Sequence, residues 1–520
     1  MKSRPIIPAI PRRRPRMMRV PTTPLGPCSR KWSTNSARRL ALIRQPQPQG
    51  TIKMDFSRRN LLVAGGAALA ASACAPLRSG SDVEADVIVI GAGLAGLHAT
   101  SLLEAAGAKV VVLEGSNRIG GRLHTLYDLP GKPDAGGIQI GSNYTRLLDI
   151  AGKLGVGLQP GGEFDRSALY YVRGKTVKQA DWPTSEVNKL VGPERQVPPA
   201  GLASVFARRM PQLANPDAWR TAEGFKIDVP YGAALKAAGA SDEAVRLIAA
   251  NLNGNDINTL SALNAARSAA IYRSAGPNAV LSVISGGSQR LPEAMAAALK
   301  SGLRMEQIVT GISEDADGVR VDIGGGRSLR ARHVICTIPF AALRGVGVHG
   351  PSADALKTAI ASLPYTYASF AYLSASEPFW KQDGLPGMVW SDDPMLGRVF
   401  VLGDSPAMLK VWLSGRDAVA MDRMAPAAAG AAIIAKLEAA RPSARGKLKL
   451  ERIFSWQKNP MARGVYHHLA AGQAPMLAAA IDATGNRLHF AGEHLAQSTS
   501  GMEGALESGE RAARIVIGKL

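Results

Sequence analysis

Residues 86–96 read DVIVIGAGLAG, an apolar and largely β-branched run followed by three glycines in the pattern G-x-G-x-x-G. The first five residues predict a buried strand, and the apolar spacing after the glycines predicts a helix to about residue 106. In this context Gly91 allows a tight turn, Gly93 lets the backbone approach a pyrophosphate, and Gly96 allows the helix to pack closely on the strand. The stretch therefore predicts the first strand, turn and helix of a dinucleotide-binding fold.

A second apolar strand, residues 109–113, follows this helix and ends at Glu114. A carboxylate at the end of the second strand is placed to accept hydrogen bonds from the ribose hydroxyls of a dinucleotide. The glycine pattern alone would fit any tight turn between a strand and a helix. The order strand, helix, strand and acidic residue favours the dinucleotide interpretation.

The residues after Glu114 distinguish between NAD and FAD. Residues 118–122 read RIGGR, and here the sequence resembles the flavin amine oxidase family, whose members carry a glycine pair and an arginine after the ribose-binding glutamate. The resemblance implies FAD. Gly121 would bring backbone amides close to the flavin side of the pyrophosphate, and Arg122 would donate charge-assisted hydrogen bonds to it.

The same resemblance returns near the C-terminal end of the chain. Residues 488–494 read LHFAGEH and residues 501–510 read GMEGALESGE, and both segments are similar to the C-terminal FAD motif of the family. The resemblance implies that Gly492 and Glu493 lie near the phosphate and ribitol of FAD. It also implies that a helix beginning near Met502 points its positive end at the flavin ring.

These motifs predict an α/β protein whose Rossmann-like, doubly wound FAD-binding domain is discontinuous, with an inserted α+β substrate-binding domain. Weaker similarity in the middle of the chain implies that Val309 contacts the adenine, so the resemblance spans about residues 83–517. The expected FAD-binding segments are residues 83–150, 280–345 and 450–520, and the expected substrate-binding segments are residues 151–279 and 346–449.

The N-terminal region differs in composition from the rest of the chain. Residues 1–53 hold thirteen of the 62 Lys and Arg residues and none of the 41 Asp and Glu residues, so they carry much of the formal charge of +21. We expect this leader to be disordered, or not to be translated at all if the protein begins at Met54. The remaining chain shows no concentrated basic stripe, which argues against nucleic-acid binding.

Residues 54–74 combine Arg58 and Arg59 with a short apolar run and with small residues that precede Cys74. This layout is typical of a twin-arginine signal peptide, and we expect the Tat translocase to export the folded protein to the periplasm. Lipid anchoring at Cys74 is an alternative. The apolar run is too short for a permanent membrane span, and no later stretch is long and charge-free enough for one. With three cysteines in the chain, neither an internal disulfide nor a metal site is expected.

The substrate site is expected beside the flavin, where amine oxidation needs aromatic walls and little water. Residues 455–466 resemble the family segment that passes the flavin, and Tyr466 falls on one of the two aromatic positions that flank the amine. Val465 stands where covalently flavinylated relatives have cysteine, which implies non-covalent FAD. Gly501 stands at the second aromatic position, so we expect a pocket that is wider on that side. His467 is a further candidate for substrate contact. Adjacent histidines on a strand point to opposite faces, so at most one of His467 and His468 can reach the pocket.

Three positions bear on the reaction itself. In the register of the resemblance, the lysine that holds a water near flavin N5 in many relatives aligns with Phe370. Because such a lysine assists flavin reoxidation, a periplasmic electron carrier becomes an alternative to oxygen. Gln139 stands near the position where L-amino acid oxidases have an arginine that clamps the substrate carboxylate, and Arg146 is displaced from it. A plain amine is therefore favoured over an amino acid.

The expected reaction is oxidation of a small-molecule amine to an imine by hydride transfer to flavin N5, and the imine is then hydrolysed to an aldehyde or ketone. No catalytic residue is assigned, because the family lysine is absent. A FAD-dependent dehydrogenase or desaturase acting on a C–C bond is an alternative that Phe370 and Gly501 support. An L-amino acid oxidase is a second alternative. A non-catalytic flavin-binding protein is disfavoured, since a complete FAD motif is seldom kept without redox use.

Overall fold

The computed structural model describes residues 83–520 apart from residues 162–166 and 484. The described residues belong to one compact unit. The predicted leader and signal peptide, residues 1–74, lie outside the described residues, so the expectations that rest on them stay predictions.

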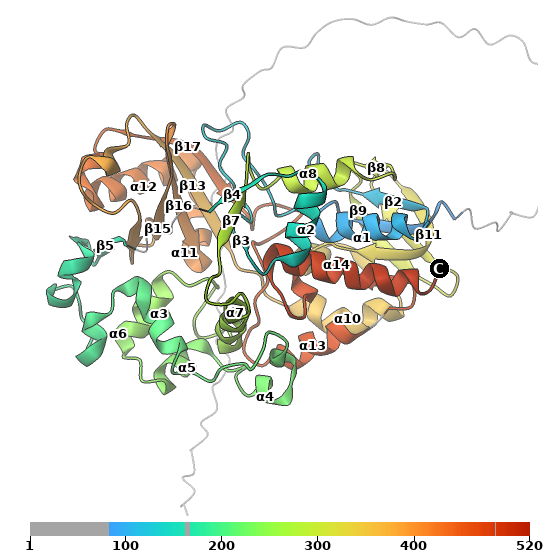
Figure 1. The fold of residues 1–520 in the computed structure, drawn as a ribbon, viewed down its shortest axis with the longest axis horizontal. Helices are drawn as coiled ribbons and strands as arrows, with labels where there is room; N and C mark the ends of the chain where they lie inside the picture. The colour runs from blue at the N-terminus through green and yellow to red at the C-terminus, as the bar shows by residue number, and fades with distance from the viewer. Residues whose placement is uncertain (1–82, 162–166, 484) are drawn as a thin grey trace, which may run out of the picture. The chain divides into compact units, whose positions relative to one another are not determined.

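An eight-stranded sheet carries the glycine motif (Figure 1). Its strand β1 (Ala85–Ile90) is almost wholly buried and pairs in parallel with β2 (Val110–Leu113) and with β11 (Arg327–Cys336). Helix α1 (Leu94–Ala105) connects β1 to β2. This unit of strand, helix and strand has the order that the sequence predicts and confirms the Rossmann-like α/β fold.

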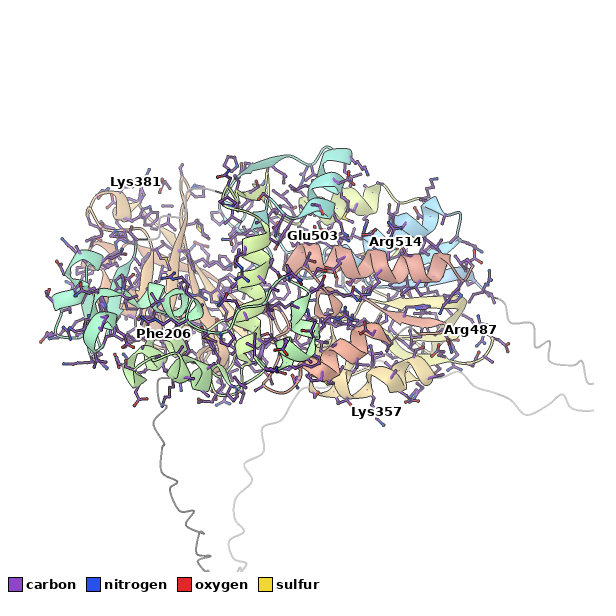
Figure 2. The ribbon with its side chains drawn as sticks, turned by 60° about the horizontal axis from the view of Figure 1, so that its bottom comes forward. Phe206, Lys357, Lys381, Arg487, Glu503 and Arg514 are labelled. Atoms are coloured by element: carbon purple, nitrogen blue, oxygen red, sulfur yellow. The ribbon has the colours of Figure 1, made fainter. Side chains whose placement is uncertain are left out.

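The C-terminal end of the chain completes the same sheet. Strand β18 (Leu488–Phe490) pairs in parallel with β11, and helix α14 (Gly501–Ile517) packs against α1. The two helices lie side by side in Figure 1, and Figure 2 marks Glu503 and Arg514 along α14. Gly509 permits this close packing, because a Cβ atom there would overlap the carbonyl oxygen of Ala95. The sheet is therefore assembled from distant parts of the chain.

The remaining strands of this sheet lie on either side of β11, β1 and β2. The order is β12-β9-β10-β11-β1-β2-β8, with β18 beside β11. Strand β10 (Val319–Ile323) pairs antiparallel with β11 and with β9 (Val309–Glu314). The outer strands are β12 (Gly347–His349) and β8 (Leu303–Arg304).

A second, seven-stranded sheet has the order β17-β13-β16-β15-β14-β5-β6 and is antiparallel except where β14 pairs with β5. Helices α11 (Gly415–Asp422) and α12 (Pro426–Ala440) bury their apolar faces against it. Its strands are β5 (Leu169–Val172), β6 (Lys175–Val177), β13 (Ala368–Ala375), β14 (Val389–Ser391), β15 (Arg398–Asp404), β16 (Ala407–Ser414) and β17 (Leu448–Ser455).

The rest of the described chain is mainly helical. Strands β3 (Ile140–Gly141), β4 (Leu158–Pro160) and β7 (Leu281–Ile284) form a small third sheet. Because all the described residues belong to one compact unit, the division into a FAD-binding and a substrate-binding domain stays a prediction. The other helices are α2 (Thr145–Lys153), α3 (Pro199–Ala207), α4 (Ala222–Phe225), α5 (Tyr231–Ala237), α6 (Asp242–Ala250), α7 (Ala262–Ser274), α8 (Arg290–Ala297), α9 (Phe340–Leu343), α10 (Pro351–Ser362) and α13 (Ala474–Asp482).

Buried histidines make the stability of this fold depend on pH. His489 on β18 is 3% exposed, and its ring lies 5.7 Å from that of His333 on β11. Burial, together with the positive charge of Lys519, lowers the pKa of His489 to about 3. The unfolded chain, whose histidines have a pKa of about 6.5, then binds more protons than the folded chain, so stability falls as the pH drops below 6.5.

We expect the free energy of unfolding to fall by about 1.4 kcal/mol per pH unit for each such histidine, between about pH 6 and the folded-state pKa. The variant His489→Phe should flatten this slope in urea titrations, and replacing the exposed His349 by Gln should leave it unchanged. An equal slope for native protein and His489→Phe would contradict the assignment.

Candidate functional site

Both large sheets contribute residues to the wall of one cavity of about 930 Å³. Most of the residues predicted to bind the cofactor or the substrate line it. These are Gly91, Gly93, Glu114, Gly121, Arg122, Val309, Tyr466, Gly492, Glu493, Gly501 and Met502. Three others, Gly96, Phe370 and His467, belong to the described residues but not to the cavity wall. The structure thus brings most of the predicted set together around one space, and the role of each residue there stays a prediction.

The glycines at the end of β1 make room for close backbone approaches. Gly91 has a φ of 106°, which L side chains rarely adopt, and a Cβ atom there would overlap the side chain of Thr337. A Cβ atom at Gly96 would overlap the carbonyl oxygen of Gly91. Gly96 therefore acts through the packing of α1 on the turn, while Gly91 and Gly93 face the cavity.

Glu114 ties the end of β2 to the glycine turn. Its Oε2 accepts a hydrogen bond of 2.8 Å from the backbone N–H of Ala92, and its Oε1 accepts bonds of 2.8 Å from the N–H and the hydroxyl of Ser116. A carboxylate has about four acceptor positions, so these bonds leave capacity for ribose hydroxyls. The sequence did not predict that this carboxylate also holds the glycine turn in place.

Two helices begin at the cavity wall without a side-chain cap. Gly93 and Leu94 at the start of α1 line the cavity, and so do Gly501 and Met502 at the start of α14. The first N–H groups of a helix have no partner within the helix and carry partial positive charge, which makes such ends binding sites for anionic groups. The open glycine turn, the acceptor Glu114 and these two helix ends fit FAD.

A buried charge cluster joins the N-terminal motif to the C-terminal motif. Arg122 Nη1 donates to Glu493 Oε1 at 2.6 Å and to the carbonyl oxygen of Val465 at 3.2 Å. His467 Nδ1 lies 2.6 Å from Glu493 Oε2, and the N–H of His467 donates to Oε1 at 3.1 Å. Burial would raise the pKa of Glu493, but His467 and Arg122 outweigh it and hold the pKa well below its ordinary value. Glu493 is therefore a carboxylate at neutral pH.

Aromatic side chains from β15, β16 and the segment after β17 form the far wall of the cavity. They are Phe400, Trp412, Trp456 and Tyr466. Burial raises the pKa of Tyr466 to about 12, so its hydroxyl stays protonated in the physiological range. At the other aromatic position, the hydroxyl of Tyr144 lies 3.5 Å from where a Cβ atom of residue 501 would stand. A tyrosine from another segment thus lies beside Gly501, which the sequence did not reveal.

Phe370 is a residue of strand β13, and its side chain is buried in the core with 1% exposed. The Nζ atom of Lys410, from the neighbouring strand β16, lies 4.0 Å from the centre of the Phe370 ring and donates to the carbonyl oxygen of Asp134 at 3.1 Å. Burial lowers the pKa of Lys410 to about 7. The sequence showed that no lysine occupies position 370, but it gave no sign that one from the next strand covers it.

The two residues that the sequence analysis considered for binding a substrate carboxylate, Gln139 and Arg146, lie in different places. Gln139 lines the cavity, whereas Arg146 binds Glu503 and Glu510 on α14 with N–O distances of 3.2 and 2.5 Å. Another arginine, Arg398 on β15, lines the cavity. Sequence reasoning considered cationic partners only near Gln139 and therefore missed Arg398.

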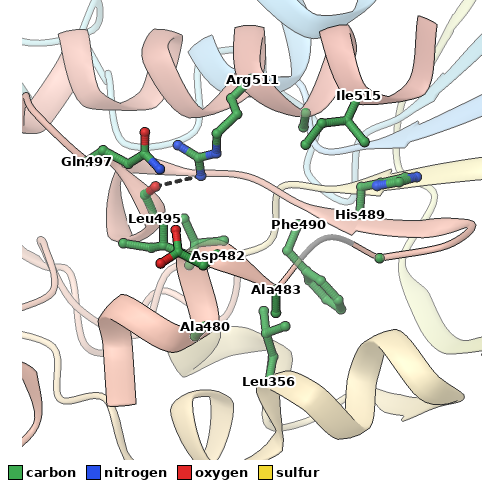
Figure 3. Close-up of a pocket in the computed structure, with 13 residues that line it drawn as sticks. Leu356, Ala480, Asp482, Ala483, His489, Phe490, Leu495, Gln497, Arg511 and Ile515 are labelled. Carbon is green, nitrogen blue, oxygen red and sulfur yellow. Dashed lines mark hydrogen bonds between the residues drawn. The ribbon is translucent and has the colours of Figure 1, made fainter. Parts of the chain in front are cut away.

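A second, smaller cavity of about 140 Å³ lies between α10, α13, β18 and α14 (Figure 3). Arg511 reaches into this region and donates to the carbonyl oxygen of Leu495 at 2.7 Å. None of the residues predicted to bind cofactor or substrate lines it. Within residues 83–161, 167–483 and 485–520, no group of acidic, histidine and cysteine side chains is arranged to hold a metal ion, and no helix is long and apolar enough to cross a membrane.

The fold and the glycine-lined cavity define a protein of the Rossmann-like dinucleotide-binding class. The chain belongs to the family described as flavin containing amine oxidoreductase, whose model matches residues 94–517. It is accordingly a flavoprotein oxidoreductase of the amine oxidase type.

Relatives that match most of the chain carry names of flavin-dependent oxidases. It is 26% identical over 480 residues to the flavin-dependent L-tryptophan oxidase RebO of Lentzea aerocolonigenes, a match that spans 83% of this chain and 97% of the relative. It is 24% identical over 474 residues to flavin-containing amine oxidase B of Homo sapiens, spanning 83% and 86%. The names of these relatives include both an amino acid and amines.

Solved structures confirm the fold. Cyclohexylamine oxidase from Brevibacterium oxydans IH-35A matches with a TM-score of 0.69 and 25% identity over 84% of this chain and 99% of that one. Putrescine oxidase bound to putrescine matches with a TM-score of 0.67 and 22% identity over the same shares of the two chains.

Proposed function

We propose that this enzyme binds FAD without a covalent bond and oxidises a small-molecule amine to an imine, which water hydrolyses to an aldehyde or ketone. The observation that carries the proposal is that one cavity is lined both by residues of the FAD motifs and by the aromatic residues Trp412 and Tyr466. When bound, FAD supplies at N5 the acceptor for the hydride equivalent that leaves the carbon next to the amine nitrogen.

The chain supplies positioning and exclusion of water. Arg122 and the start of α14 offer positive charge toward the cofactor end of the cavity. Trp412, Phe400 and Tyr466 offer apolar surface for the substrate, which favours the neutral amine that must lose hydride. No described side chain is assigned as a general base, since the reaction of a neutral amine needs none.

The test is product balance. Purified enzyme is incubated with a panel of primary and secondary amines, and the carbonyl product, the released amine or ammonia and the reduced acceptor are counted. Equal amounts of carbonyl product and two-electron-reduced acceptor support the proposal. A C–C dehydrogenase or desaturase would instead leave the nitrogen in place and form an alkene, and a non-catalytic flavoprotein would form no product.

We expect the flavin to be released when the protein is denatured. Val465 lines the cavity where a covalent thioether would need a cysteine, and the described part of the chain has one cysteine, Cys336, which is buried in β11. Acid precipitation should therefore leave FAD in the supernatant, where its fluorescence and chromatographic mobility identify it. Flavin that stays with the precipitate would contradict non-covalent binding.

We propose that a periplasmic carrier competes with oxygen for the electrons, because Phe370 replaces the lysine of many relatives. Lys410 Nζ already lies 4.0 Å from the Phe370 ring, so the variant Phe370→Lys would bring two amines together. The native enzyme is the better probe. Reduced enzyme should react faster with an artificial carrier than with oxygen in stopped flow, and reoxidation by oxygen as fast as turnover would contradict this.

We further propose export by the Tat translocase, which transports folded proteins and would carry the cofactor-loaded enzyme to the periplasm. The support is the layout of residues 54–74, which lie outside the described part of the chain. Replacing Arg58 and Arg59 by Lys should leave active enzyme in the cytoplasm. Undiminished periplasmic activity of this variant would rule the signal out.

A further inference from the structure

Arg398 is a cation in the cavity wall, and no described carboxylate forms an ion pair with it. It is the first residue of β15, and it shares the cavity-facing side of this strand with Phe400, two residues further on. Its Nη2 donates to Asn253 Oδ1 at 2.9 Å, and its Nε is buried without a hydrogen-bond partner. Its guanidinium carbon lies 5.2 Å from the ring centre of Trp412, the residue paired with it on β16.

Two other shielded arginines have carboxylate partners, whereas the buried Arg267, which does not line the cavity, donates to backbone carbonyl oxygens. Arg122 pairs with Glu493 at 2.6 Å, and Arg441, which directly follows α12, pairs with Asp383 at 2.6 Å. Among the described residues, no carboxylate lies within ion-pair distance of Arg398. The two carboxylates that line the cavity are already engaged, Glu493 by Arg122 and Glu114 by backbone N–H groups.

A half-buried guanidinium without an anion is costly, because its charge and its buried Nε lose water without full replacement. Burial lowers the pKa of Arg398, but an arginine stays protonated at neutral pH. The planar fork suits a carboxylate, which it binds with two parallel hydrogen bonds, and the Trp412 ring beside it adds a cation–π contact.

We infer that Arg398 binds the carboxylate of the substrate, so that the preferred substrate is an amine that bears a carboxylate, with an apolar or aromatic side chain against Trp412 and Phe400. This inference rests on the proposed amine oxidation and specifies its substrate class. It reverses the preference for a plain amine that the sequence suggested from Gln139. The cationic partner comes from β15 instead of from the segment after the Gly136-Gly137 pair.

The experiment compares matched substrates that differ only in the carboxylate: an aromatic L-amino acid, its decarboxylated amine and its methyl ester, with an ω-amino acid as a further arm. The native enzyme should show a kcat/KM at least about 100-fold higher for a carboxylate-bearing member than for the plain amine. Activity with the ω-amino acid alone would place the carboxylate away from the reacting carbon and would still support the inference.

Three variants sharpen the comparison. Arg398→Leu should lower kcat/KM for the acid by about 100-fold or more, while kcat/KM for the plain amine changes by less than about tenfold. Arg398→Lys, which keeps the charge but loses the fork, should restore part of the difference. Arg452→Leu removes an exposed arginine of the same sheet, paired with Asp128, and should leave the preference as it is.

A binding measurement separates this inference from the proposed function. Benzoate, which cannot be oxidised as an amine, is titrated into oxidised FAD-loaded enzyme beside its neutral counterpart benzamide, and the flavin spectrum and calorimetric heat are followed. Benzoate should bind at least about tenfold more tightly than benzamide, and Arg398→Leu should abolish the difference. Arg398-dependent binding without amine turnover would uphold the inference and sink the proposed function. Amine turnover with no preference for carboxylates would do the reverse.

Discussion

The variant Gly96→Ala should purify without FAD. A Cβ atom at residue 96 would overlap the carbonyl oxygen of Gly91 and come within 3.2 Å of the Val89 side chain, so α1 must move away from the end of β1. That shift displaces the uncapped start of α1 and the glycine turn, both of which line the cavity. We expect the dissociation constant for FAD to rise at least about 100-fold, or about 2.7 kcal/mol. It is measured by reconstituting the apoprotein with FAD.

The matched control is Gly152→Ala on α2. A Cβ atom there meets no other atom within 4 Å and needs no unusual backbone angle, so this variant should keep its flavin. A third variant, Gly509→Ala, would overlap the carbonyl oxygen of Ala95 and push α14 from α1, so it should resemble Gly96→Ala. If Gly96→Ala retained FAD at the native stoichiometry, the packing that we assign to this position would be wrong.

The variant Glu493→Leu should lose both stability and cofactor. It leaves Arg122 and His467, whose side chains are 19% and 9% exposed, without their shared carboxylate. Removing one partner of a buried ion pair typically costs about 3–5 kcal/mol, and we expect a loss of at least about 3 kcal/mol in the free energy of unfolding. His467 would also lose both of its contacts with Glu493, so the neighbouring cavity-wall residues Val465 and Tyr466 should loosen.

Urea unfolding with and without added FAD measures both effects. Glu493→Gln, which keeps hydrogen-bond acceptance without charge, should fall between the native protein and Glu493→Leu. The control is Glu377→Gln, whose partner Lys447 and own side chain are 28% and 43% exposed, and which should leave the urea midpoint nearly unchanged. A loss below about 1 kcal/mol for Glu493→Leu would show that the cluster contributes little.

The features predicted best from the sequence are those that local geometry dictates. The roles of the glycines after β1 and of the acidic residue after β2 can be predicted from residue type and spacing. A tight turn, a closely packed helix and a ribose acceptor require those residue types at those positions. The order of elements followed from the same motif, and the parallel pairing of β1 with β2 agrees with it. Glu493 was found from the resemblance, but its ion pair with Arg122 joins residues 371 positions apart and could not be read locally.

The substrate end of the cavity was harder to predict, because side chains there come from strands with no motif. Arg398 and Trp412 face each other only because β15 and β16 pair in that register. The absence of an arginine beside Gln139 excluded one position for a residue that binds the substrate carboxylate. It gave no information on arginines of the second sheet, such as Arg398. In the same way, the sequence showed that position 370 is not a lysine, but it did not predict that Lys410 lies over the Phe370 ring.

The most direct test of the central claim is anaerobic reduction of the bound flavin. The FAD-loaded enzyme is mixed without oxygen with each member of a panel of amines and amino acids, and the visible flavin absorbance is followed to completion. At least one compound should bleach the flavin, with one carbonyl product formed per flavin reduced. Flavin that a chemical reductant bleaches, but that no amine or amino acid reduces, would contradict the assignment of this cavity to amine oxidation.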